Sequence, residues 1–67
     1  MASYAMYGKA LVRMNKRGTA RIMYHGDDLG LKYRVQEYDI ENGRWITVHW
    51  TNSPLDAMRI LDKTEDD

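Results

Sequence analysis

Two glycine-containing turns, each flanked by residues of alternating polarity, constrain the fold of this chain more than any other feature. The first turn is Asn15-Lys16-Arg17-Gly18-Thr19. Asn is favoured at the first position of a type I turn, and Gly at the left-handed position that follows it. Apolar and polar residues alternate on both sides of this turn, as in strands that bury one face. The sequence therefore predicts strands 4–14 and 19–25, joined by the loop 16–18.

This loop length determines which residues face each other across the first hairpin. It places Val12 opposite Ile22 on one face of the hairpin. On the other face it places Arg13 opposite Arg21, a like-charge pair that costs stability unless an anion or a partner relieves it. One face is therefore apolar and the other mostly basic, so the turn chemistry and the alternation agree.

Residues 38–45 resemble the minimal designed hairpins that are built on the pattern Tyr-Asp-x-x-x-Gly-x-Trp. The resemblance covers these eight residues and concerns local structure only. It implies a four-residue loop in which Asp39 faces Arg44 and Tyr38 faces Trp45.

The competing register for the second hairpin is a two-residue Asn42-Gly43 turn. The four-residue loop pairs Val35 with Val48, whereas the two-residue turn would set a carboxylate against Val48. We therefore favour the four-residue loop and predict strands 31–39 and 44–51.

The chain ends with the signals of one helix. Ser53 is suited to cap the helix N-terminus, Pro54 to occupy its first position, and Asp56 to follow three residues after the cap. The next apolar residues recur at helical spacing. We predict a helix over 54–63 and an acidic, frayed end over 64–67.

These elements predict an α+β fold, a four-stranded antiparallel sheet with two tight hairpins and one C-terminal helix packed on one face. A single helix covers one face of a sheet, and the apolar face is the one that matches. The predicted core residues of the sheet are Ala10, Val12, Met14, Ala20, Ile22, Tyr24, Leu31, Tyr33, Val35, Ile46, Val48 and Trp50.

The uncovered face of the predicted sheet is basic and carries aromatic residues. Residues 1–25 hold five Lys or Arg and no acid, whereas residues 26–67 hold all ten acids. The same alternation assigns five of the ten Lys and Arg residues, and none of the acids, to the uncovered face. Its predicted members are Tyr7, Lys9, Leu11, Arg13, Arg21, Met23, His25, Lys32, Arg34, Gln36, Tyr38, Trp45, Thr47, His49 and Thr51.

Size and composition limit what such a chain can do. Its 67 residues fit a single domain, 1–67, with a modest core. It has no Cys, so neither disulfides nor a Cys-based zinc site can stabilise it. With no apolar run long enough to cross a membrane and no leader, the chain reads as cytoplasmic and is not expected to bind a membrane.

Residues with the chemistry of catalysis or metal binding lack the necessary spacing. His25 and His49 do not form a ligand motif with Asp27 and Asp28, which lie between glycines where a turn favours Asp. A nucleophile and its base need a sheltered cleft with a third, orienting group, and no pattern here provides one. We predict that the protein is not an enzyme and has no metal, cofactor or catalytic residue.

The leading functional prediction is nucleic-acid binding on the uncovered face. Basic side chains neutralise phosphates and aromatic rings stack on unpaired bases. In outline the architecture is similar to plant ethylene-response-factor domains and to the arm-binding domains of tyrosine integrases, which place such a face on DNA, although the signature residues of both are absent. The predicted contact residues are Lys9, Leu11, Arg13, Arg21, Met23, Lys32, Arg34, Tyr38, Trp45 and His49.

Two alternatives use the same face. In the first, a small inhibitor or adaptor, of the type that phages direct against host enzymes, binds an acidic protein surface with Leu11, Met23 and Trp45 as anchors. In the second, two copies of the chain pair through this face as a homodimer.

Overall fold

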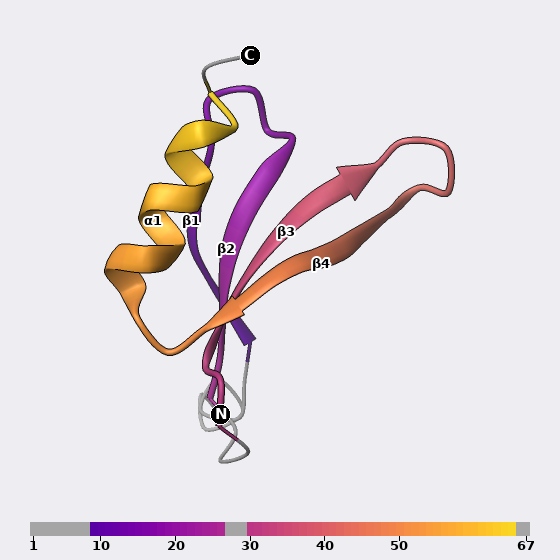
Figure 1. Ribbon diagram of the computed structural model, residues 1–67. Coiled ribbons are helices and arrows are strands. Elements are labelled where there is room, and N and C mark those ends of the chain that lie inside the picture. Colours follow the sequence, from indigo (N-terminus) through magenta and orange to yellow (C-terminus); the bar gives the residue numbers. More distant parts are fainter. Residues whose placement is uncertain (1–8, 27–29, 66–67) are drawn as a thin grey trace, which may run out of the picture.

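The computed structural model describes residues 9–26 and 30–65 and shows an α+β fold (Figure 1). Its antiparallel sheet has the strand order β1-β2-β3-β4, followed by one helix. The elements are β1 (Lys9–Met14), β2 (Ala20–His25), β3 (Tyr33–Asp39), β4 (Arg44–Thr51) and α1 (Pro54–Lys63). The predicted fold class is confirmed. The predicted strand residues 4–8, the turn residues 27–29 and the tail residues 66–67 lie outside the described residues.

Helix α1 begins where its capping residues predict. Ser53 has an extended backbone, and its side chain accepts a hydrogen bond from the Asp56 backbone N at 3.2 Å. This bond satisfies one of the donors that every helix leaves free at its N-terminus. Pro54 takes the first helical position, where its missing N–H costs nothing.

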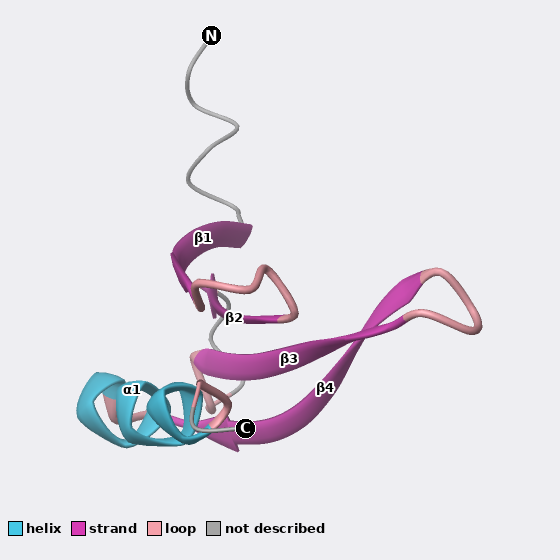
Figure 2. Ribbon diagram, turned by 90° about the horizontal axis from the view of Figure 1, so that it is seen from above, coloured by secondary structure: helices cyan, strands magenta, loops and turns pink. Residues whose placement is uncertain are grey.

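The helix packs on one face of the sheet, against β2, β3 and β4 (Figure 2). The buried core of the described residues is small: Ala20, Ile22, Val35, Ala57 and Leu61, with Tyr33, Met58 and Ile60 packed against it. Several predicted core residues are instead exposed, namely Ala10, Val12, Met14, Leu31, Ile46, Val48 and Trp50. The buried core is too small to cover the side chains of these seven apolar residues as well.

The first hairpin follows the predicted register only at the end far from its loop. Leu11 lies opposite Met23 as predicted, but Val12 is an extra residue, and beyond it Arg13 lies opposite Ile22. The loop has four residues instead of the predicted three, since the Asn15 backbone N bonds the Ala20 carbonyl. The pairing next to the loop is therefore displaced by one residue, and the extra residue Val12 restores the predicted pairing beyond it. The predicted Arg13–Arg21 pair is therefore wrong.

The second hairpin follows the predicted register only near its loop. The pairing runs as predicted from Asp39 and Arg44 back to Gln36 and Thr47. Val48 is then an extra residue, and the pairs beyond it are Val35 with His49, Arg34 with Trp50 and Tyr33 with Thr51. Both extra residues lie on edge strands, where such bulges are common.

Beyond the body, β3 and β4 continue alone as a projecting hairpin (Figures 1 and 2). The pairing of β2 with β3 ends at Ala20 opposite Glu37, and one further backbone bond joins Tyr38 N to Thr19 O at 2.9 Å. We call residues 37–46 the arm. Its turn uses Gly43 at a φ of +66°, a left-handed conformation that suits glycine.

Candidate functional site

The face of the sheet that points away from α1 is the candidate site, and we call it the open face. Residues that pair across antiparallel strands have their side chains on the same face. The register therefore assembles three rows, which are Leu11–Met23–Arg34–Trp50, Met14–Arg21–Gln36–Thr47 and Tyr38–Trp45. The three rows contain no carboxylate.

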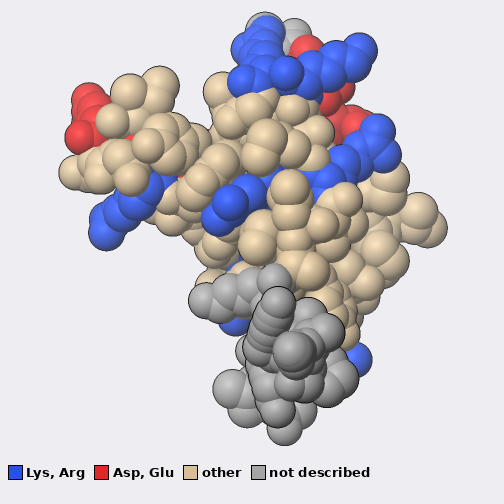
Figure 3. All heavy atoms as spheres, turned by 180° about the vertical axis from the view of Figure 1, so that it is seen from behind, with Lys and Arg blue, Asp and Glu red and all other residues tan. Residues whose placement is uncertain are grey.

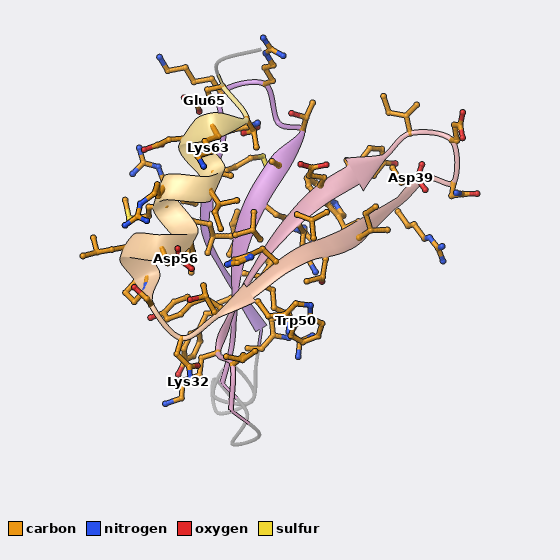
Figure 4. All side chains as sticks on the ribbon, viewed as in Figure 1. Lys32, Asp39, Trp50, Asp56, Lys63 and Glu65 are labelled. Atoms are coloured by element: carbon orange, nitrogen blue, oxygen red, sulfur yellow. The ribbon has the colours of Figure 1, made fainter. Side chains whose placement is uncertain are left out.

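Two arginines of the open face are stacked on two tryptophans. The Arg21 guanidinium lies 4.1 Å from the ring centroid of Trp45, and that of Arg34 lies 4.1 Å from the ring centroid of Trp50. At this distance a cation is attracted by the electrons of the ring face, and each contact stabilises by about 0.5–1 kcal/mol at an exposed site. Trp50 is 47% exposed and points away from the helix (Figure 4).

Hydrogen bonds and ring contacts fix the middle of the open face. Arg21 Nε donates to Gln36 Oε1 at 2.9 Å, and Gln36 Nε2 donates to Thr47 Oγ1 at 3.0 Å. The Tyr38 and Trp45 rings meet edge to face, with centroids 5.2 Å apart. These side chains are held in one arrangement before any partner binds, which lowers the entropy lost on binding.

The structure brings six of the ten predicted site residues together on the open face: Leu11, Arg21, Met23, Arg34, Tyr38 and Trp45. Lys32 is exposed and lies just before β3 (Figure 4). Lys9, on β1, pairs with His25, on β2, in a further row of the same face. The side chain of Lys9 lies outside the described part of the chain.

The bulges move two predicted site residues to the helix side of the sheet. Arg13 lies opposite the core residue Ile22. His49 lies opposite Val35, and its Nε2 atom is 3.0 Å from the Asp56 carboxylate on α1. Thr51 also lies on the helix side, opposite Tyr33, and is buried. His25 lies opposite Lys9 as predicted, but it is buried rather than exposed.

The His49–Asp56 contact joins β4 to the first turn of the helix. Hydrogen bonds from His49 and then from Thr51 hold the pKa of the Asp56 carboxyl below its ordinary value. A carboxylate in the first turn also faces the positive end of the helix dipole. This histidine therefore has a structural contact, and we exclude it from the candidate site.

Sequence reasoning missed two residues of the open face, Met14 and Trp50. Each was predicted in the core, and each follows an extra residue in its strand. Because side chains alternate between faces, one inserted residue reverses every position beyond it. No local sequence signal marked either insertion.

Other chemistry finds no support in the described residues. Within 9–26 and 30–65, no three His, Asp or Glu side chains are grouped closely enough to hold a metal ion. None of the helices in that part of the chain has the length and apolar character needed to cross a bilayer. Comparisons with models of known families, with curated proteins and with solved structures gave no match.

Proposed function

We propose that this chain is a small non-enzymatic binding protein that attaches to a protein partner through the open face. The observation that carries this proposal is the composition of its three rows. They contain Trp45, Trp50, Tyr38, Arg21, Arg34 and two methionines, and no carboxylate. Aromatic residues, Met and Arg are enriched at the centres of protein interfaces, whereas Lys, Asp and Glu are depleted there.

The arrangement of these residues supports the same conclusion. Trp, Tyr and Arg contribute most of the binding energy in many interfaces when they are desolvated together. Here each guanidinium is held over an indole ring. The ring covers one flat face of the guanidinium, and the N–H groups at its edge keep a fixed orientation. A partner that supplies carboxylates to Arg21 and Arg34, within an apolar rim, matches this face.

A pull-down from nuclease-treated lysate tests the proposal, with the tagged chain as bait. We expect a stoichiometric complex with one protein, lost for Trp50→Ala and only mildly weakened by salt. Leu55→Ala is the matched control, because Leu55 is exposed on the helix and away from the open face. A bait that retains no protein, or equal retention by the Trp50→Ala variant, would refute the proposal.

Nucleic-acid binding is the second candidate, and the absence of carboxylates from the three rows favours it. The stacking role assigned to Trp45 is weakened, since Arg21 already lies over its ring. Binding would then depend on the guanidiniums of Arg21 and Arg34, which could contact phosphates or base edges.

Fluorescence titration of the tryptophans with single- and double-stranded DNA and RNA at low salt separates the two candidates. If nucleic acid is the partner, affinity falls steeply with salt and on Arg34→Ala. Arg13→Ala is the matched control, because Arg13 lies on the other side of the sheet. Equal losses of affinity for the two variants would indicate only a general attraction of nucleic acid to positive charge on the protein.

A further inference from the structure

The ends of the two hairpins form a second feature, which shares Met14, Arg21, Tyr38 and Trp45 with the open face. Both ends lie toward the same end of the sheet, and the two hairpins separate from each other there (Figure 1). At their junction lies a cleft of about 220 Å³. It is lined by Arg17, Thr19, Ala20, Glu37, Tyr38 and Thr64. The molecule therefore has two projecting limbs with a cleft between them.

The arm is an acidic limb with exposed apolar side chains. It carries Glu37, Asp39 and Glu41 against the single cation Arg44. Ile40, at its tip, is 81% exposed, the largest value among the exposed large hydrophobic residues of the described chain. The turn is nevertheless fixed, because the Asp39 carboxylate accepts from Glu41 N, Asn42 N and Asn42 Nδ2. An apolar side chain held outward on a rigid turn contributes nothing to the core.

The other limb, residues 12–21, is basic and also has exposed apolar residues. It carries Arg13, Lys16, Arg17 and Arg21 and no acid. Val12 and Met14 are 49% and 41% exposed. Seen from behind, one lobe of the molecule bears Lys and Arg side chains, and the tip of the neighbouring lobe bears Asp and Glu (Figure 3).

The contacts of the basic limb already include one carboxylate. Glu65 accepts a hydrogen bond from the Lys16 backbone N at 2.9 Å. Arg17 lines the cleft and, within residues 9–26 and 30–65, forms no ion pair. Its guanidinium is therefore available to a carboxylate that enters from outside.

The arrangement of the limbs is self-complementary. A twofold rotation about an axis through the opening between the limbs places the arm of one copy beside the basic limb of the other. The same rotation forms the reciprocal contact, so that the interface closes on two copies. In such a pair, acidic groups would meet basic ones at both contacts, and exposed apolar side chains from both limbs would be buried together.

We propose that two copies of this chain form a dimer by clasping their limbs, with the arm of each copy against the Arg17 side of the cleft of the other. The dimer contacts centre on Arg17 and the arm, whereas Arg34 and Trp50 of the open face lie outside both limbs. Charge contacts at exposed sites are individually weak, and the dimer therefore depends on concentration and weakens with salt.

Sedimentation equilibrium of the full chain tests the dimer through charge reversal. We expect the molar mass of the wild type to double with rising concentration at low salt and to fall back at high salt. Arg17→Glu and Glu41→Lys each place like charges at both contacts, so each variant alone stays monomeric. An equimolar mixture of the two restores unlike charges at both contacts and therefore restores the dimer.

Two controls make the outcome decisive. Trp50→Ala, which alters the open face, is expected to leave the dimer unchanged, and circular dichroism checks that every variant keeps its fold. A wild type that stays monomeric up to the highest concentration reached at low salt would overturn the proposal. So would a mixture of the two charge variants that remains monomeric.

Discussion

The loops of the two hairpins begin in the same way but are stabilised differently. Asn15 Oδ1 accepts from the backbone N of Thr19 and Ala20, as Asp39 Oδ1 accepts from the backbone N of Glu41 and Asn42. Asn15, however, is buried, with only 4% of its surface exposed. Its Nδ2 group also donates to Thr64 Oγ1 at 2.9 Å, at the C-terminal end of the helix.

This difference shows how one turn chemistry serves two purposes. The first loop is joined to the helix and is part of the cooperative fold. The second loop is fixed by its own hydrogen bonds and by the Tyr38–Trp45 pair, and α1, the helix of the described residues, lies away from it (Figure 1). The arm can therefore be held rigid for an external contact at no cost to the core.

The largest expected effect compares two isoleucines on the helix side of the two hairpins. Ile22 is 1% exposed beneath the helix, whereas Ile46 is 40% exposed on the arm. Ile22→Ala is expected to lower the free energy of unfolding by about 2–5 kcal/mol, because it leaves a cavity in a small core. Ile46→Ala should change it by less than about 0.5 kcal/mol. Urea denaturation measures both, and similar losses would show that the arm belongs to the core.

The second prediction concerns the buried loop residue. Asn15→Ala leaves the buried Ala20 backbone N without its side-chain acceptor and removes the link to Thr64. We expect a loss of about 1–3 kcal/mol in the free energy of unfolding. Thr64→Val removes one acceptor of Asn15 and the hydroxyl bond to the Leu61 carbonyl, but it leaves Asn15 Oδ1 bonded within the loop, so it should cost less. An Asn15→Ala variant with an unchanged free energy of unfolding would mean that the loop is not coupled to the helix.

A smaller and local effect is expected at the exposed loop. Asp39→Ala removes the carboxylate that accepts from Glu41 N and Asn42 N. Since this turn is exposed, the free energy of unfolding should fall by no more than about 1 kcal/mol. Amide hydrogen exchange should become faster at residues 41–43 and stay unchanged in the core. Faster exchange throughout the sheet would contradict the independence of the arm.

The smallest effect is the pH dependence that arises from the joint between β4 and α1. The pKa of Asp56 is lowered in the folded state, so its carboxylate stabilises the fold fully above the ordinary Asp pKa of about 4. That contribution is lost as the pH falls through the lowered, folded-state pKa. The urea midpoint of the wild type should therefore approach that of Asp56→Asn in acid. A difference between the two that persists at the lowest pH would contradict this assignment.

Much of the fold could be predicted from local sequence. Ser53 and Pro54 predicted the start of the helix, and the bounds of β4 are as predicted. The Tyr38–Trp45 pair and the four-residue loop of the second hairpin are also confirmed. Each of these features is determined within a few residues by turn geometry, capping or proline chemistry.

The composition of the open face could be predicted only in part. Arg21, Arg34, Tyr38 and Trp45 were assigned to it correctly, and the stacking of arginine on tryptophan was not foreseen. That stacking joins residues on different strands, and for Arg34 it requires Trp50 to be turned outward by the bulge at Val48. Pairs of this kind depend on the register of the whole sheet.

The sequence by itself determined the number and order of the elements, their turns and the helix cap, because these follow from the preferences of neighbouring residues. The tertiary structure decided on which face His49 and Trp50 lie. Packing α1 against β2, β3 and β4 buries Thr51 and brings His49 to Asp56, which the shift at Val48 makes possible. With a side-chain period of two residues, a single insertion reverses the faces, and its position is set by contacts distant in sequence.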